Sequence, residues 1–252
     1  MTELIASWKE EEQAPFAGWD FSYLDGRMLE DQAPWSYTTR AKELMGQAQS
    51  VLDLDTGGGE RLLNMREAWP AKVVATETYP PNLQLARERL EPLGVTVLDV
   101  ENNELKPLPF GNAEFDLILD RHAAINVDEV ARMLTPGGTF LTQQVHGMWA
   151  HDLLAAFGAT PQWPDATPAR YVPWLERVGM EIVMHEDWEG ELAFIDVGAI
   201  VYYLKAVPWL VPGFSVEMHT ENLLALQRRL EVEGKLVFVA KKYMIEAQKP
   251  LR

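Results

Sequence analysis

The sequence predicts an α/β fold, a mostly parallel sheet with helices on both faces. From Val51 onward, short apolar segments alternate with helical patterns, as in a chain of strand–helix–strand units. The first apolar segment, residues 51–54, leads through Asp55 and Thr56 into three consecutive glycines and then a helix start. Glycines let the backbone take positive φ and approach a ligand closely, so this turn is the first candidate site.

Length and composition narrow the class of protein. The chain has 252 residues, is 47% hydrophobic and 24% charged, and fits one α/β domain with additions or two small ones. We expect no membrane span and no secretory signal, because no long apolar run occurs and the N-terminus is acidic. Zero cysteines exclude disulfides and thiolate chemistry and fit a cytoplasmic setting. A net charge of −16 without a long basic run disfavours nucleic-acid partners.

Acidic side chains follow several of the predicted strands. Later strands are expected at residues 72–75, 95–98, 115–120 and 139–145. Glu77 follows the second strand, 24 positions after Asp53, near the spacing at which an acid meets a ribose in such folds. Asp99 ends the third strand and Asp120 the fourth. Because open α/β sheets bind ligands at the carboxyl ends of their strands, these acids are candidate ligand contacts.

The segments outside residues 50–145 are expected to be additions to this core. Residues 1–48 are predicted to be a helical lead-in over the site, with a helix from residue 39 to 48 capped by Thr38. The remaining chain, 49–252, is predicted to be the ligand-binding domain, with an insertion at about 190–230 that covers a substrate. Other predicted elements are a helix from 60 to near 70, a helix at 168–178, a strand at 181–184, a strand then helix within 191–204, a helix at 220–233 and a last strand at 235–243.

The order and spacing of four features resemble those of the class I S-adenosylmethionine-dependent methyltransferases. These features are the glycine turn, Glu77, Asp99, and the strand that ends at Asp120 and is followed by a Pro-Gly-Gly. The resemblance covers about residues 50–145 and implies a Rossmann-like sheet of seven strands, one of them antiparallel near the C-terminus. It departs at Asp55, where that family usually has glycine. Five segments together also resemble a largely uncharacterised bacterial group of type 11-like methyltransferases, which supplies no substrate: residues 18–24, 57–60, 121–122, 142–145 and 196–199.

The resemblance implies which residues hold the cofactor, S-adenosylmethionine. Glu77 would accept hydrogen bonds from the ribose hydroxyls. Asp99 would accept from the adenine amino group, while the N–H of Val100 donates to the ring. The full predicted set is Asp53, Thr56, Gly57, Gly58, Gly59, Glu77, Thr78, Asp99, Val100 and Asp120.

Few strong catalytic groups are expected, because methyl transfer is an in-line displacement whose thioether leaving group needs no acid. Positioning the acceptor and excluding water are the main tasks. His122 or His146 is predicted to act as a base if the acceptor must lose a proton, and Arg121 to hold a carboxylate of the acceptor. Gln143 and Gln144 should point to opposite faces of their strand.

The leading functional prediction is a methyltransferase acting on a small molecule. Eight of nine tryptophans lie outside residues 50–145, which suits a flat, apolar or cationic acceptor but equally suits additions that pack their own cores. Two alternatives stay open: a non-catalytic cofactor-binding or partner protein, and an RNA methyltransferase. A dinucleotide-dependent oxidoreductase is disfavoured because Leu62 stands at the third glycine of that fingerprint, and no metal-ligand spacing occurs.

Overall fold

The computed structural model describes residues 2–16 and 19–251, and the chain divides into two compact units. We call residues 34–145, 166–187 and 242–251 the sheet unit. The accessory unit comprises residues 2–33, with 17 and 18 aside, together with 146–165 and 188–241. Gly18, the first residue of one segment that resembles the bacterial group, lies outside the described residues.

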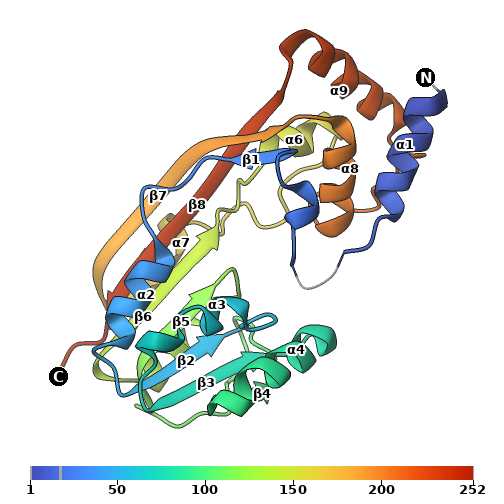
Figure 1. Cartoon of the computed structure of the whole chain (residues 1–252). Helices are drawn as coiled ribbons and strands as arrows, with labels where there is room; N and C mark the ends of the chain where they lie inside the picture. Colours follow the sequence, from blue (N-terminus) through green and yellow to red (C-terminus); the bar gives the residue numbers. More distant parts are fainter. Residues whose placement is uncertain (1, 17–18, 252) are drawn as a thin grey trace. The chain divides into compact units, whose positions relative to one another are not determined.

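Seven strands run through the sheet unit in the order β7-β8-β6-β5-β2-β3-β4 (Figure 1). They are β2 Ser50–Leu54, β3 Lys72–Glu77, β4 Thr96–Asp99, β5 Phe115–Arg121, β6 Leu134–Val145, β7 Glu181–Phe194 and β8 Leu236–Gln248. Neighbours from β4 to β6 are parallel, and β8 is antiparallel to β6. The predicted α/β sheet is confirmed. The strand count is eight rather than seven, because β7 and β8 continue into the accessory unit, where β1 Met28–Glu30 pairs with β7.

The register of the parallel strands brings the predicted site residues to one edge of the sheet. Leu54 at the end of β2 lies opposite Asp120 of β5, and Glu77 of β3 lies opposite Asp99 of β4. Arg121 lies opposite Gln143 of β6. Parallel strands all end at the same edge, so acids that are 20 or more residues apart in sequence become neighbours.

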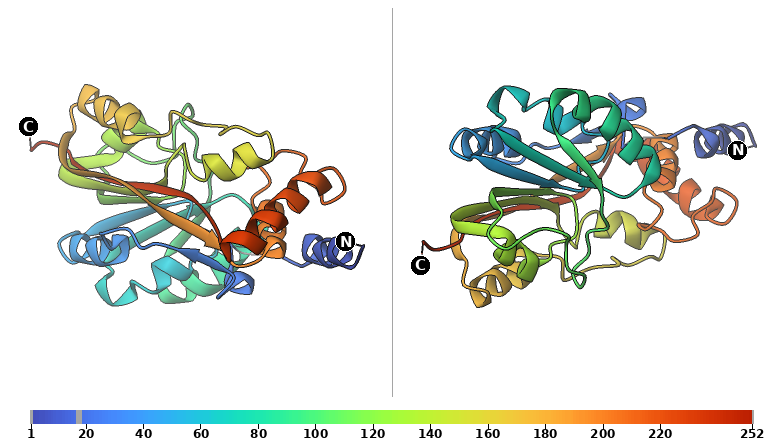
Figure 2. Two further views of the ribbon diagram at one scale, coloured as in Figure 1. Left: turned by 90° about the horizontal axis from the view of Figure 1, so that it is seen from above. Right: turned by 90° about the horizontal axis from the view of Figure 1, so that it is seen from below.

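Helices cover both faces of this sheet (Figure 2). One face packs against α2 Tyr37–Met45, α3 Glu60–Leu63 and α4 Pro80–Leu90, and the other against α5 Val127–Met133 and α7 Pro168–Arg177. Short 3-10 turns occur at Ser22–Leu24, Arg66–Ala68 and Glu91–Leu93. Successive strand residues alternate between the two cores, as Val51 and Leu52 do, which is why the parallel strands are apolar throughout.

The beginnings and ends of several elements differ from the sequence prediction. Ser36, not Thr38, caps α2, because the Ser36 backbone is extended and its Oγ accepts from the N–H of Thr39 at 3.2 Å. The helix expected from residue 60 to near 70 is one turn, α3, followed by a 3-10 turn. There, the indole of Trp69 and the N–H of Met65 both bond the Leu62 carbonyl, which a continuing α-helix would use.

The two-unit division also differs from the expected boundary at residue 48. The sheet unit begins at residue 34 because α2 lies on the sheet, where its apolar residues Tyr37, Ala41, Leu44 and Met45 enter the core. The spacing of these residues is the three-to-four-residue repeat of one helix face.

The accessory unit is held by its own aromatic and aliphatic core. Its helices are α1 Thr2–Gln13, α6 His151–Ala156, α8 Val197–Ala206 and α9 Thr220–Glu233. Trp8 and Trp149 are buried there, and the Trp149 indole donates to the Tyr203 hydroxyl at 2.8 Å. For these two tryptophans, packing within the addition is therefore the observed role. No helix in the described ranges is long and apolar enough to span a membrane.

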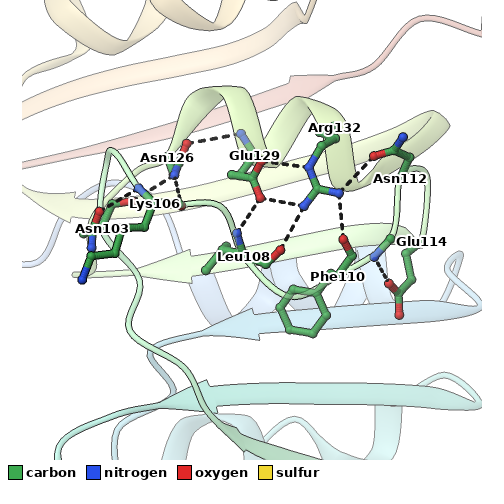
Figure 3. Close-up of polar contacts among 10 residues, drawn as sticks. Asn103, Lys106, Leu108, Phe110, Asn112, Glu114, Asn126, Glu129 and Arg132 are labelled. Atoms are coloured by element: carbon green, nitrogen blue, oxygen red, sulfur yellow. Dashed lines mark hydrogen bonds and ion pairs between the residues drawn. The ribbon is translucent and has the colours of Figure 1, made fainter.

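A polar network fixes the loop that follows β4 (Figure 3). Arg132 of α5 donates to the carbonyls of Leu108 and Phe110 at 3.2 and 2.7 Å, and its ion pair with Glu129 closes at 2.6 Å. Glu129 in turn accepts from the N–H of Leu108 at 2.6 Å. The side-chain amide of Asn126 donates to two further loop carbonyls, both at 2.9 Å. The network anchors the loop that carries the chain away from Asp99 and Val100.

Replacing Arg132 with Met should loosen this loop. Because the part-buried carbonyls and the buried Glu129 lose their donor, we expect a loss of about 2 kcal/mol in the free energy of unfolding, measured by urea titration. Amide hydrogen exchange at Leu108 should also accelerate. Arg87→Met, which removes an exposed pair with Glu91 at 3.8 Å, is the matched control and should cost at most about 0.5 kcal/mol. Equal effects of the two variants would contradict the role of the network.

Candidate cofactor and acceptor site

The turn after β2 is tied to the neighbouring strand β3. The N–H of Thr56 donates to the Thr76 carbonyl at 2.8 Å, and the N–H of Asp55 donates to the Thr76 hydroxyl at 3.1 Å. Asp55, Gly57 and Gly59 have φ of 50°, 64° and 82°. Asp55 stands where the resemblance expects glycine, and the left-handed conformation explains that preference. Aspartate is among the few other residues that tolerate it.

Close packing also restricts Gly59. A Cβ on Gly59 would lie 2.8 Å from the Leu90 side chain, whereas a Cβ on Gly58 would meet only the ends of the Glu60 and Arg89 side chains, which can move. Arg89 of α4 donates to the Gly58 carbonyl at 2.8 Å and forms an ion pair with Glu60. The turn is therefore clamped from outside in a conformation that places backbone at the ligand-binding edge.

Carboxylates gather at the strand ends beside this turn. Burial raises the pKa of Asp53 to about 6, although Thr56 and the nearby Arg121 act in the opposite direction. Burial raises the pKa of Asp55 to about 7; the carboxylates of Glu77 and Asp53 raise it further, against a hydrogen bond from Asn102. These acids hold protons more tightly than they would in water, so a positively charged ligand would be favoured beside them.

Asp120 extends this acidic group to the end of β5. It is fully buried, and burial together with the charge of Asp55 raises its pKa well above the ordinary value. Its Oδ1 accepts from the side-chain amide of Gln144 at 2.6 Å. Gln143, the next residue toward the N-terminus, contacts Trp35 on the α2 face instead, so the two glutamines face different partners as predicted.

A small cavity of about 60 Å³ lies next to the turn. Its lining residues are Tyr37, Asp53, Leu54, Asp55, Thr56, Arg61, Met65 and Arg121. Both signs of charge therefore face one space, an arrangement that suits a zwitterion such as the amino-acid end of a ligand. Among the residues that the structure describes, the buried Tyr37 hydroxyl has no hydrogen-bond partner, and neither has Oδ1 of Asn102 near Asp55. Both are available to a ligand.

Glu77 and Asp99 form the adjoining part of the site. Oε1 of the buried Glu77 accepts from the N–H groups of Thr78 and Tyr79, both at 2.8 Å, which holds the carboxylate at the end of β3. Asp99 is exposed, and its Oδ1 accepts from the Thr78 hydroxyl at 3.2 Å. Val100 follows it, half-buried. The structure thus brings together the residues predicted for the ribose and the adenine.

His122 and Gln143 lie past the cavity, at the ends of β5 and β6. His122 has φ of 64°, and its Nε2 lies 3.5 Å from Nε2 of Gln143. The surrounding protein and the cations Arg121, Lys242 and Arg61 lower the pKa of His122 well below its ordinary value. His122 nevertheless remains exposed to solvent, so the residues around its ring line an open site and do not enclose it. The ring is neutral at physiological pH.

Trp35 links these residues to a groove on the same sheet face. Its indole N–H donates to Oε1 of Gln143 at 2.8 Å. A groove of about 250 Å³ is lined by Trp35, Ser36, Thr39, Arg40, Glu43, Met184 and Met244. Met244 of β8 lies directly opposite Gln143 of β6. An aromatic face and two thioethers suit a flat apolar molecule.

His146 is not brought to this site within the sheet unit. It belongs to the accessory unit, is buried, and its Nδ1 accepts from the N–H of Met148 at 2.9 Å in a local turn. Its catalytic role stays a prediction. Among residues 2–16 and 19–251, no group of three or more His, Asp or Glu is placed to hold a metal ion.

Comparison with known proteins finds a matching family model. Residues 51–138 match the family described as "Methyltransferase domain", and this segment contains all ten residues predicted for the cofactor. The comparisons support a class I S-adenosylmethionine-dependent methyltransferase.

Relatives of this methyltransferase are distant or partial. It is 33% identical over 122 residues to a protein of Thermus thermophilus named demethylmenaquinone methyltransferase, a match that covers 44% of this chain and 55% of the relative. The match thus spans about half of that relative's length. Among solved structures, a protein of unknown function from Deinococcus radiodurans R1 has a TM-score of 0.59 at 15% identity, covering 98% of each chain. An S-adenosylmethionine-dependent methyltransferase from Aquifex aeolicus has 0.50 at 15%, covering 97% of each. Both likenesses show the shared fold.

The residues of the site fit S-adenosylmethionine, which carries a sulfonium, an ammonium and a carboxylate. Asp53, Asp55 and Asp120 are buried acids with raised pKa values, and a positively charged ligand beside them would favour their ionised forms. Arg61 and the unpartnered Tyr37 hydroxyl offer donors beside them. Sequence reasoning missed Tyr37, Arg61, Asn102 and Trp35 as site residues. Arg61 had a detectable signal, its place two residues after the glycine turn, whereas the others depend on tertiary packing.

Replacing Asp55 with Asn should stabilise the free protein in a pH-dependent way. Because the folded-state pKa of Asp55, about 7, is raised, its charge costs stability as the pH rises from about 4 through 7. Asparagine keeps the shape and tolerates positive φ. We therefore expect a gain on the order of 2 kcal/mol at pH 8 and almost none at pH 4.5, from urea unfolding at both pH values.

Glu88→Gln on the exposed side of α4 is the control for a lost surface carboxylate and should change stability little at either pH. A gain from Asp55→Asn that is equal at pH 4.5 and pH 8 would show that backbone strain, not charge, is relieved.

Proposed function

We propose that this chain transfers a methyl group from S-adenosylmethionine to a small, largely apolar acceptor that carries a hydroxyl group. The observation that carries the proposal is the meeting of a clamped glycine turn with buried carboxylates at the ends of β2, β3 and β5. Such a site favours a ligand with positive charge over a neutral or anionic nucleotide. When bound, S-adenosylmethionine supplies an electrophilic methyl group and leaves as a neutral thioether.

The chain's own residues would divide the binding between them. Glu77 presents a carboxylate, fixed through Oε1, to the ribose hydroxyls, and Asp99 lies beside it for the adenine. Arg61, Tyr37 and Asp53 line the same cavity. Arg61 and Tyr37 would donate to the carboxylate of the methionine end, and Asp53 would accept from its ammonium. We assign Arg121 to this end of the cofactor, rather than to the acceptor, because it also lines that cavity.

The acceptor would lie in the groove beside Trp35 and Met244. The Thermus thermophilus relative is named for a quinone-type substrate, and an aromatic ring with hydroxyl groups matches this lining. His122 is neutral and exposed, so it can take the proton of such a hydroxyl. Attack on the methyl group then comes from an electron-rich oxygen or ring carbon.

The test is methyl transfer by the purified protein from labelled S-adenosylmethionine to a reduced naphthoquinone lacking one ring methyl group. We expect labelled product from the wild type. His122→Ala should lower kcat about 10²- to 10⁴-fold with cofactor affinity unchanged. Cofactor binding without label in this quinol, or in lipid and small-molecule extracts, would support a non-catalytic protein. Label that is lost on ribonuclease treatment would support an RNA methyltransferase.

Glu77→Gln should weaken cofactor binding without disturbing the turn. Glutamine retains an oxygen for the N–H groups of Thr78 and Tyr79 but loses the charge that the ribose hydroxyls would meet. We expect Kd for S-adenosylmethionine and for its demethylated product to rise about 5- to 30-fold by calorimetry, equivalent to about 1–2 kcal/mol. Unchanged affinity would count against this placement of the ribose.

A further inference from the structure

One hydrogen-bond chain in the sheet unit has a direction that its donors dictate. The indole nitrogen of Trp35 can only donate, so the Gln143 atom that it contacts at 2.8 Å is the carbonyl oxygen, Oε1. The other end of that amide, the NH₂ group, then faces Nε2 of His122 at 3.5 Å. An amide NH₂ has no acceptor to offer, so it can meet only an unprotonated ring nitrogen.

We propose that Trp35 and Gln143 are positioning residues that hold His122 in the neutral tautomer with the proton on Nδ1 and the lone pair on Nε2. The inference rests on the proposed function, in which His122 takes a proton from the acceptor. Free neutral histidine in water prefers the proton on the other nitrogen, Nε2. The protein would therefore have to impose this tautomer.

The charged groups known to act on His122 are consistent with this assignment. They are three cations: Arg121 at the end of β5, Lys242 on β8 and Arg61 on α3. Cations cannot accept a ring N–H, and they disfavour the imidazolium. The backbone N–H of His122 donates to the Gln143 carbonyl at 3.0 Å, which keeps the two residues in register at the end of β5 and β6.

Gln143 itself has little freedom to turn over. It is buried, with 8% of its surface exposed, and a flipped amide would set its NH₂ against the indole N–H, donor against donor. The ring of Trp35 also lines the groove proposed for the acceptor. An acceptor in that groove therefore touches the residue that orients Gln143.

The geometry gives the two nitrogens a joint task. When a hydroxyl of the acceptor replaces the Gln143 amide as the donor to Nε2 of His122, it can pass its proton to that nitrogen, so that the O–H bond breaks, the N–H bond forms, and the electron pair stays on the acceptor oxygen. The N–H of Gln143 that is released from Nε2 can then donate to that same oxygen as its charge develops. The base and the oxyanion donor are thus two ends of one hydrogen-bond chain.

The direct test is nitrogen NMR of the free, folded protein with ¹⁵N-labelled histidine. Long-range ¹H–¹⁵N spectra distinguish the two neutral tautomers without any cofactor or acceptor. We expect His122 to carry its proton on Nδ1 from pH 7 to 8. A proton on Nε2 in the wild type would overturn the inference, whether or not the protein transfers methyl groups.

The variants separate positioning from simple packing. Gln143→Leu should shift His122 toward the Nε2–H tautomer, and Gln143→Glu should do so while raising its pKa by about one unit, since a carboxylate accepts where the amide donated. Trp35→Phe should give a mixture of tautomers. Trp69→Phe is the matched control, because it removes an indole bond to the Leu62 carbonyl in the same core and should leave His122 unchanged.

Turnover measurements connect the tautomer to the reaction. Gln143→Leu should lower kcat about 10-fold or more with KM nearly unchanged, and Gln143→Glu should move the acidic limb of the pH–rate profile upward. The predicted tautomer together with no methyl transfer would refute the proposed function and the base role while keeping the positioning. A Gln143→Leu variant with the wild-type kcat would refute the role of the Trp35–Gln143–His122 hydrogen bonds in catalysis.

Discussion

The site depends on one constraint: the parallel strands have their carboxyl ends on the same side of the sheet. Pairing of β2, β3, β4, β5 and β6 in one direction forces every strand to end at that edge, and four of these ends carry acids. Burial raises the pKa of Asp53, and burial together with neighbouring carboxylates raises the pKa of Asp55. Strand order thus places several carboxylates where a positively charged ligand would be favoured.

Features written in local sequence were predictable. The alternation of apolar strands with helices and the glycine turn depend on near neighbours, so the mostly parallel sheet, its two helical layers and the acids at the strand ends could be predicted. Even Asp55, the departure from the family pattern, has a readable cause in its φ of 50°. Tyr37 and Trp35 could not be placed, because their positions depend on where α2 packs against the sheet.

The errors have physical causes as well. β7 extends to Phe194 although the segment His185-Glu186-Asp187 interrupts its apolar pattern, because an edge strand keeps one side toward solvent and tolerates charge. Residues 60–69 have helical periodicity, but the competing Trp69 indole bond ends α3 after one turn. The periodicity of apolar residues predicts which face of a helix is buried, but it does not predict which backbone carbonyl a side chain will hydrogen-bond.

In the proposed site, the acidic strand ends would distinguish the cofactor from its product. The demethylated product lacks the sulfonium charge, so Asp53, Asp55 and Asp120 would lose a partner when the methyl group departs. Their repulsion would then weaken binding of the product, more strongly in alkaline than in acidic solution. On this proposal, the electrostatic cost of the buried acids would limit product inhibition.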